Sequence, residues 1–303
     1  MDTQSLRLFV LASETLNISA AERTLGMAPA VASARLAKLE TLLGAELLHR
    51  STRKVSVSLE GQDFLPYARE MIAQEEAALA AFGKGKAEVS GTLRFAAPST
   101  FAQLYIAPLL PAFIDAYPDL TLDLHLSDSQ FDLIEGSYDL ALRNSVLEDS
   151  SLTARKLADD RRILCAAPSY LEKYGAPTTA NDLTAHRLVA FRDLEPRALV
   201  SADGGKADFA PRKAAQRLVV NDGLTQVRVT RNGAGISINS LWAVHSELTA
   251  GSLVRVLPDY TLAENPALWL IYPKSNVVSS KVRVFMDYLI EQIGKSPVWV
   301  ASP

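Results

Sequence analysis

Apolar side chains recur at helical spacing in the first segment of the chain. In residues 5–16 they stand at Leu6, Phe9, Val10 and Leu16, a period that predicts a helix. Ser19-Ala20-Ala21-Glu22 then fits a capping box. In this motif the Ser19 side chain caps the next helix, and the Glu22 side chain accepts a hydrogen bond from the backbone amide of Ser19. Gly26 suits the left-handed residue that ends a short helix. The segment therefore predicts two helices, the second one short.

A third helix is predicted to begin at Pro29, because proline fits the first turn, where its missing N–H costs nothing. Apolar positions at 4-3-4 spacing predict its buried face: Ala32, Leu36, Leu39 and Leu43. Small or polar residues predict the opposite face: Ala30, Ser33, Ala34, Ala37, Lys38 and Thr41. Such a face suits a DNA major groove, where alanine can contact a thymine methyl and Ser or Lys can bond base edges or phosphates. A face packed on another helix is the alternative, and the small residues alone do not separate the two.

The next segment favours the DNA interpretation. Residues 46–50 and 54–58 predict two short strands, the second with period-two alternation. Between them Arg50-Ser51-Thr52-Arg53-Lys54 places three positive charges and two hydroxyls at one tip. Helix, short helix, helix and hairpin are the order of a winged helix-turn-helix, whose wing contacts phosphates.

A longer helix is predicted after this hairpin. Ser58 suits its cap, and Glu60 lies in its first turn. A spacing close to a heptad predicts that it pairs with a partner, through Leu65, Ala68, Ile72, Leu79 and Phe82. Glu75 interrupts this series, and packing against the chain's own wing is the alternative. Gly83-Lys84-Gly85-Lys86 ends the helix and marks a domain boundary.

From Gly91 the pattern changes to short apolar strands that alternate with helices. Examples are TLRFAA, DLALR, RILCAA, RLVV, GISI and ALWLIY. Such β-α-β repeats predict an α/β fold with mainly parallel sheets. The roughly 210 residues of this part exceed one small sheet, so two lobes are expected. Asp203-Gly204-Gly205 predicts a hairpin inserted in the second lobe.

Ligands of open α/β sheets bind beyond the carboxyl ends of the strands. Polar side chains at three such ends predict an effector site: Ser99 and Thr100 (with Phe101 beside them), Arg143, and Asn221 and Asp222. Free helix amides and an arginine favour an anionic ligand. The negative charge of Asp222 would repel an anion at the start of its own helix, and its carboxylate could instead bind a hydroxyl or an amine there. Ser99, Asn221 and Asp222 can also serve as simple helix caps, and Arg143 can pair with Asp139 or Glu148 on the surface.

Composition excludes several other classes of protein. The 303 residues suit about two or three domains, and the net charge of −3 means that any nucleic-acid contact rests on local clusters. A single cysteine, Cys165, forbids an internal disulfide and fits a reducing compartment. The first residues lack the basic n-region of a signal peptide, and no uncharged apolar run of about 18 residues occurs. A soluble, cytoplasmic protein is therefore expected.

Nothing in the sequence indicates an enzyme, a cofactor or a metal site. The four histidines lie far apart and show no metal-ligand spacing. Cys165 follows an apolar strand and is expected to be a buried structural thiol. Gly233-Ala234-Gly235 is only half a dinucleotide fingerprint and precedes a strand instead of following one, so a turn is expected.

The segment "NISAAERTLGMAPAVASARLAKLETLLGAELLHRSTRKVSVSLEGQDFLPYA" resembles the DNA-binding domain of LysR-type transcriptional regulators, a resemblance that covers residues 5–68 without a gap. It implies that Ser33 and nearby small residues face bases. This sequence departs from the family in two places. Many members carry Arg or Lys at the position of Ala34, whereas here Arg35 follows one position later, and Val31-Ala32-Ser33 stands where most members have Ala-Val-Ser. The DNA contacts expected from the pattern and the resemblance are Ala28, Pro29, Ala30, Ser33, Ala34, Arg35, Lys38, Arg50, Thr52, Arg53 and Lys54.

The resemblance continues, more loosely, through "DLIEGSYDLALR", "NGAGISI" and "LTAGSLVRVLPDY". It implies linker helices that pair into antiparallel dimers, and an effector domain of two lobes related to periplasmic solute-binding proteins. The expected domains are 1–58 (winged helix), 59–87 (linker helix) and 88–303, with lobe one at about 88–161 and 266–303 and lobe two at about 162–265. The final helix, residues 279–293, is expected to return to lobe one.

The expected function is therefore regulation of transcription by a dimer or tetramer that binds pseudo-palindromic duplex DNA. A small effector, for which the strand ends favour an anion, is the expected signal, and RNA polymerase is a further candidate partner. A small-molecule binding protein without a regulatory role is the alternative.

Overall fold

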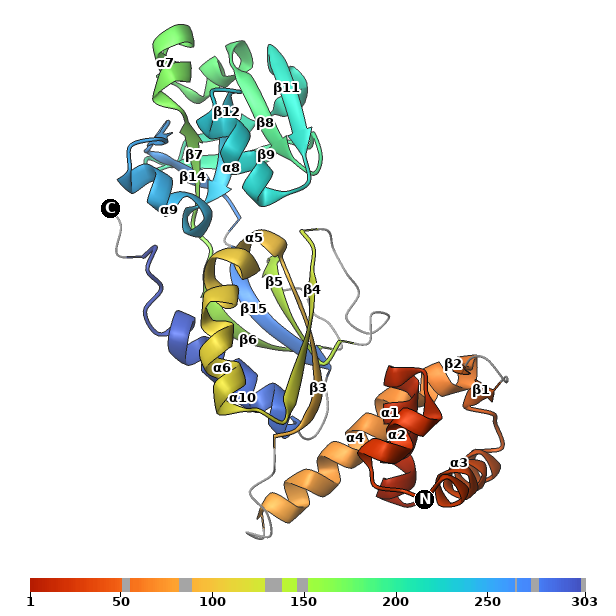
Figure 1. The fold of residues 1–303 in the computed structure, drawn as a ribbon. Helices are drawn as coiled ribbons and strands as arrows, with labels where there is room; N and C mark the ends of the chain where they lie inside the picture. The colour runs from red at the N-terminus through yellow and green to blue at the C-terminus, as the bar shows by residue number, and fades with distance from the viewer. Residues whose placement is uncertain are drawn as a thin grey trace. The chain divides into compact units, whose positions relative to one another are not determined.

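The computed structural model describes residues 1–50, 55–81, 89–128, 138–145, 152–264, 266–273 and 278–300 (Figure 1). The chain divides into two compact units, Met1–Val89 with Ser275–Arg283, and Ser90–Lys274 with Val284–Pro303. We call these the N-terminal unit and the C-terminal unit. Among the described residues, no helix is long and apolar enough to cross a membrane.

The N-terminal unit has the predicted order of elements. They are α1 (Thr3–Thr15), α2 (Ile18–Thr24), α3 (Pro29–Leu43), β1 (Leu48–Arg50), β2 (Val55–Val57) and α4 (Leu59–Ala81). The antiparallel pairing of β1 with β2 confirms the predicted hairpin.

The predicted cap of α2 is wrong. The helix begins earlier than expected, and Asn17 caps it by accepting a 3.1 Å hydrogen bond from the Ala20 amide. Asn17 has extended backbone, which aims its side chain at the free amides, whereas Ser19 already lies inside the helix. Gly26 does adopt the left-handed conformation, at φ 61°, and Pro29 is the first residue of α3.

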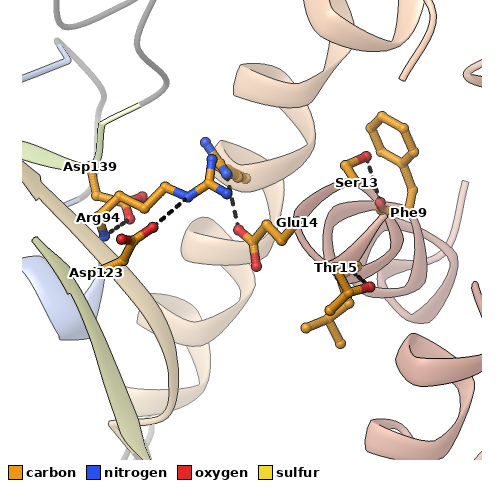
Figure 2. A network of polar contacts seen from close by, with 9 residues as sticks. Phe9, Ser13, Glu14, Thr15, Arg94, Asp123 and Asp139 are labelled. Carbon is orange, nitrogen blue, oxygen red and sulfur yellow. Dashed lines mark hydrogen bonds and ion pairs between the residues drawn. The ribbon is translucent and has the colours of Figure 1, made fainter. Parts of the chain in front are cut away.

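The core of the N-terminal unit lies between α1, α3 and the first half of α4. Phe9 of α1 and Phe64 of α4 pack with ring centroids 5.8 Å apart. Leu65 and Ala68 of α4 are buried in the same cluster as Phe9. The Ser13 hydroxyl donates to the Phe9 carbonyl at 2.8 Å within α1 (Figure 2). The contacts between helices fix α4 against α1 and α3 of its own chain.

Lobe one of the C-terminal unit is built on a five-stranded sheet of order β4-β3-β5-β15-β6. Its strands are β3 (Gly91–Ala97), β4 (Leu120–Leu126), β5 (Leu140–Ser145), β6 (Leu152–Asp159) and β15 (Ala267–Pro273). Helices α6 (Leu110–Ala116) and α10 (Ser280–Leu289) cover it (Figure 1). Phe285 of α10 lies 5.1 Å from the Phe95 ring of β3 and 4.9 Å from the Phe113 ring of α6, so the last helix does return to lobe one.

Lobe two holds a second five-stranded sheet, of order β11-β8-β12-β7-β13, and a three-stranded sheet, β10-β9-β14. The larger sheet consists of β7 (Arg162–Ala166), β8 (Arg187–Phe191), β11 (Gln216–Val220), β12 (Ile236–Ser240) and β13 (Val254–Arg255). The smaller consists of β9 (Arg197–Ser201), β10 (Lys206–Phe209) and β14 (Tyr260–Leu262). Antiparallel pairing of β9 with β10 confirms the hairpin predicted around Asp203.

The expectation of mainly parallel sheets is wrong. In lobe one β3 runs parallel to β4 and β5, but β15 runs antiparallel to β5 and β6. In lobe two β8 runs parallel to β11 and β12, but β7 runs antiparallel to β12 and β13. The physical reason is the path of the chain: β15 and β7 are the strands by which it enters each lobe from the other, and they are not part of a local β-α-β crossover.

The remaining helical segments are short. In lobe one α5 (Ser99–Phe101) continues through η1 (Ala102–Ile106) and η2 (Ala107–Leu109) into α6, and η5 (Ile290–Gly294) extends α10. In lobe two they are α7 (Pro168–Tyr174), η3 (Ala180–Ala185), η4 (Pro211–Lys213), α8 (Gly223–Arg231) and α9 (Leu241–Thr249). Both α5 and α8 begin just beyond the carboxyl end of a strand, where the sequence predicts the effector site.

Candidate functional sites: an exposed helix face and a cleft

The outward face of α3 has the composition that the sequence predicts. Ala32, Leu36 and Leu39 are buried against α1 and α4. The small and polar residues on the other side are all exposed: Ala28, Pro29, Ala30, Ser33, Ala34, Ala37 and Lys38. The helix therefore presents a surface of short side chains, apart from Lys38 and the exposed aliphatic residues Val31 and Leu42 at its edge.

Arg35 lies at the edge of this face and is engaged by the protein itself. Its guanidinium Nη1 forms a 2.5 Å ion pair with Oδ1 of Asp2. Asp2 is also the cap of α1, where it accepts from the Ser5 amide at 3.0 Å and the Ser5 hydroxyl at 2.8 Å. Burial raises the pKa of Asp2, but these hydrogen bonds and the charge of Arg35 outweigh it and lower the pKa below its usual value.

The predicted wing residues are only partly described. Arg50 ends β1 opposite Val55 of β2, while Thr52, Arg53 and Lys54 lie outside the described residues. Ser58 joins the hairpin to α4: its hydroxyl donates to the Glu46 carbonyl at 2.5 Å and accepts from the Gly61 amide at 2.9 Å. The hairpin is thereby tied to the start of α4.

Two residues predicted to pair α4 with a partner belong to the chain's own core. Leu65 and Ala68 are buried under α1, so the prediction that they form a dimer seam is wrong. Ile72 packs partly against the same core, and Glu75 accepts from Thr3 at 2.8 Å and from Arg7 at 3.3 Å.

Beyond Glu75 the same face of α4 is open. Leu79, one heptad after Ile72, is 48% exposed, and Phe82 lies outside the described residues. The periodic apolar series therefore serves two roles in turn, first covering the chain's own core and then facing outward.

The C-terminal unit contains a cleft of about 1080 Å³ between its two lobes. Polar and aromatic side chains from both lobes line it, among them Thr100, Arg143, Arg162, Arg192, Gln226 and Trp269. Of the predicted effector residues, Thr100 and Arg143 are part of this lining.

The other predicted effector residues do not line the cleft. Phe101 is fully buried and packs against Tyr105, Trp242 and Trp299, with ring centroids 5.0–6.0 Å away. Asp222 caps α8, accepting from the Thr225 amide at 2.6 Å. Ser99 and Asn221 are also absent from the lining residues. Phe101 therefore belongs to the core and Asp222 to the cap of α8, instead of the cleft, while an effector contact by Ser99 or Asn221 stays a prediction.

A residue that the prediction missed, Asp128, occupies the place expected for an anion. It is buried, follows β4, and lines the cleft. One carboxylate oxygen accepts from the Thr100 hydroxyl at 3.0 Å and from the Gly223 amide at 2.7 Å, and the other accepts from the Thr100 amide at 3.4 Å. Thr100 belongs to lobe one and Gly223 begins α8 in lobe two, so the carboxylate joins the lobes.

Glycine is required at the far end of this contact. A Cβ on Gly223 would lie 2.8 Å from the Thr100 hydroxyl oxygen and 3.3 Å from a carboxylate oxygen of Asp128. A second contact crosses the lobes nearby, where the Tyr105 hydroxyl donates to the Trp242 carbonyl at 2.5 Å. The sequence signal for Asp128 was its position directly after a strand, the same signal that selected Asp222.

The arginines of the cleft differ in their partners. Arg162 binds Asp160 at 2.8 Å, and Arg197 binds Asp193 at 2.9 Å. For Arg192, no carboxylate lies within ion-pair distance among the described residues. The Phe191 ring centroid lies 5.1 Å from the guanidinium carbon of Arg192. Partial desolvation lowers the pKa of Arg192, against the opposing influence of the Asp128 charge.

The backbone at Arg192 is unusual as well. Arg192 has φ 69°, and the Asp193 amide donates to the Phe191 carbonyl at 2.9 Å across it. This is a γ-turn with a positive central φ, a strained form that is rare for residues with a Cβ. Strain of this kind persists where the surrounding structure enforces it, often at ligand sites.

The single cysteine behaves as a structural residue. Cys165 is fully buried in β7, where it accepts a 3.2 Å hydrogen bond from Asn239. Burial raises the pKa of its thiol to about 11. The reactive thiolate is therefore scarce near neutral pH.

Comparisons with known proteins agree along the whole chain. Residues 3–62 match the family model "Bacterial regulatory helix-turn-helix protein, lysR family", and residues 86–294 match "LysR substrate binding domain". The chain is 31% identical to the HTH-type transcriptional regulator DmlR of Escherichia coli (strain K12), covering 94% of this chain and 92% of that protein. It is also 31% identical to the regulator CrgA of Neisseria meningitidis serogroup C (strain 8013), covering 97% and 98%.

Solved structures match over nearly the whole chain as well. The structure of CrgA from Neisseria meningitidis matches with a TM-score of 0.61 at 29% identity, covering 97% of this chain and 99% of that one. The full-length structure of AphB, a virulence activator of Vibrio cholerae, matches with a TM-score of 0.59 at 26% identity, covering 97% and 100%.

Proposed function

We propose that this chain, which belongs to the LysR family of transcriptional regulators, reads duplex DNA with the outward face of α3 and responds to a small organic anion in its interlobe cleft. The family and the named relatives are regulators and not enzymes. They favour this function over that of a binding protein without a regulatory role.

The single observation that carries the DNA-reading part is the exposed face of α3. An α-helix fits the major groove only if the side chains between its backbone and the bases are short or can bond base edges. Ala30, Ser33 and Ala34 meet that condition, and all three are exposed. We assign base contacts to these residues, and phosphate contacts to Lys38, to the basic wing residues Arg50, Arg53 and Lys54, and to the hydroxyl of Thr52.

Two copies of the chain would present two such helices to a pseudo-palindromic site. The open face of α4 at Leu79 is the surface we assign to the pairing, in place of Leu65 and Ala68. Ile72 lies at its edge, and Phe82 continues the spacing. A dimer of dimers and a contact with RNA polymerase belong to the same proposal, since control of transcription requires the bound regulator to recruit or exclude the polymerase.

The anionic character of the effector rests on Arg192 and Arg143. The carboxylate of Asp128 already uses the Gly223 amide, so the start of α8 is not the place for a second anion. Arg192 lines the cleft and, among the described residues, forms no ion pair at contact distance, although the charge of Asp128 acts on its guanidinium. A carboxylate ligand would supply the charge-assisted partner that Arg162 and Arg197 find within the protein.

The test of the DNA-reading part uses a bulky substitution on the exposed face. Sites selected from a pool of random duplexes would be measured by fluorescence anisotropy with the full chain. Ala34→Phe should weaken binding by at least about tenfold, because the ring holds the helix away from the groove, and leave the melting temperature unchanged. Ala202→Phe, an equal change at an exposed position of lobe two, serves as the control. Equal affinity of the two variants would refute the docking.

A further inference from the structure

Arg35 sits where a DNA-binding helix meets the phosphate backbone, yet it already has a partner. The residue is 100° round α3 from Ala34 and lies beside Lys38, at the rim of the exposed face. Its side chain is 35% exposed and forms the 2.5 Å ion pair with Asp2. A phosphate that approaches this rim therefore meets an arginine whose charge is already matched.

Asp2 is not a loose terminal side chain. It caps α1 through both the amide and the hydroxyl of Ser5, and Ser5 is itself buried. The next residue, Thr3, donates to Glu75 of α4 at 2.8 Å. The start of α1 is thus held on both sides, and the carboxylate of Asp2, whose pKa is lowered by these hydrogen bonds and by Arg35, is ionised at neutral pH.

Carboxylates lie among the cations at this rim. A hollow beside the exposed face of α3 is lined by two cations, Arg35 and Lys38, and by two carboxylates, Asp2 and Glu75. Sequence-independent affinity for DNA grows with the number of phosphates that cations neutralise. A carboxylate that holds one arginine lowers this affinity equally for every sequence, while base contacts from Ser33 and its neighbours stay intact. Asp2 would therefore set the overall affinity for DNA and its salt dependence, and the ratio of specific to non-specific binding would stay with the base contacts.

We propose that Asp2 is a positioning residue that withholds Arg35 from the phosphate backbone and thereby sets the salt dependence of DNA binding. The inference rests on the proposed function, because it requires the exposed face of α3 to approach DNA. Asp2 acts through Arg35, as a positioning residue, and touches no base. The departure that places arginine at position 35 instead of 34 puts the guanidinium within reach of the first helix cap.

The test removes the charge of Asp2 and keeps its cap. Asparagine is as good a cap as aspartate, so Asp2→Asn should preserve α1 while it releases Arg35. Anisotropy titrations of the full chain, purified with a C-terminal tag, would use a duplex of random sequence over a range of salt concentrations. The slope of log affinity against log salt should steepen by about one, the contribution of one additional phosphate contact. At low salt, random-sequence binding should tighten about two- to fivefold, as fits an exposed ion pair.

A double-mutant cycle ties the effect to Arg35. Arg35→Ala alone should leave the slope at its wild-type value, and Asp2→Asn combined with Arg35→Ala should do the same. Asp63→Asn is the control for charge alone, because Asp63 is an exposed carboxylate on α4 of the same unit. It should steepen the slope much less than Asp2→Asn does.

Three results would overturn the inference: an unchanged slope for Asp2→Asn, a steeper slope that survives in the double variant, or an equal effect of Asp63→Asn. The Ala34→Phe variant separates this failure from failure of the proposed function. If Ala34→Phe abolishes binding while Asp2→Asn leaves the slope unchanged, only the role of Asp2 is refuted. If Ala34→Phe binds normally, the docking is refuted, and the role of Asp2 is refuted with it.

Discussion

Replacing Asp128 by asparagine tests the contact that joins the two lobes. The carboxylate accepts three hydrogen bonds, from the hydroxyl and amide of Thr100 and from the Gly223 amide, and both of its oxygens face donors. Asparagine retains one oxygen and replaces the other by an NH₂ group, which is only a donor. In either orientation of the new side-chain amide, therefore, its NH₂ group faces a donor of Thr100 or Gly223.

The size of the effect follows from the strongest hydrogen bond that the substitution breaks. A hydrogen bond to a charged group contributes about 1.5–3 kcal/mol, and a buried donor left without a partner costs about 1–3 kcal/mol. The 3.4 Å contact to the Thr100 amide is long and adds little. We therefore expect the free energy of unfolding of the C-terminal unit to fall by about 2–3 kcal/mol. For a unit of this size that lowers its melting temperature by roughly 4–12 °C.

Differential scanning calorimetry of the full chain measures this change. Asp123→Asn, on strand β4 just before Asp128, is the matched control, because Asp123 is 41% exposed and pairs with Arg94 at 3.5 Å on the surface (Figure 2). The control should cost less than about 1 kcal/mol. Gly223→Ala should also destabilise the unit, and the two changes combined should cost less than their sum, since both disrupt the same interlobe contact. If Asp128→Asn and Asp123→Asn melt together, the interlobe carboxylate contributes nothing measurable.

Four further outcomes are expected. Leu79→Asp should lower the mass of the full chain in light scattering, and an unchanged mass would show that α4 does not pair there. Ser58→Ala should cost about 1 kcal/mol in urea unfolding through loss of the helix cap, and a neutral result would contradict the cap. Because its pKa is about 11, only roughly one part in a thousand of the Cys165 thiol should be thiolate at pH 8. The thiol should therefore react with Ellman's reagent only in denaturant, and rapid reaction in the native protein would contradict its burial. Arg192→Ala should abolish stabilisation by small carboxylates in a thermal-shift screen, while Arg217→Ala, an exposed control, should not.

Local periodicity was sufficient for the buried face of the third helix. The buried face of α3 follows from the spacing of Ala32, Leu36 and Leu39, because a helix has one repeat whatever surrounds it. The cap of α2 was harder to predict, since Asn17 and Ser19 are both good cap residues two positions apart. The backbone conformation of Asn17 decides between them, and that conformation depends on how α1 ends.

The role of α4 could not follow from its own sequence. A heptad-like series predicts that one face of a helix will be buried, but it does not identify the segment or the partner chain that buries it. Leu65 and Ala68 are covered by α1 of the same chain, whereas Leu79 lies past the end of that contact and remains open. The division depends on how far α1 reaches along α4, which is a property of the packed unit.

The cleft shows the same limit with a chemical consequence. Asp128 and Asp222 carry identical sequence signals, a carboxylate directly after a strand, yet Asp222 turns to its own helix and Asp128 reaches the start of α8 in the other lobe. Once a protein carboxylate holds the Gly223 amide, the positive end of α8 no longer selects for an anionic ligand. The preference for an anionic ligand would then depend on an arginine that forms no ion pair among the described residues. In the cleft Arg192 meets that condition. An effector that binds there would meet two lobes that Asp128 already joins. Its binding would therefore alter a cleft whose lobes are already in contact, and would not bring separate lobes together.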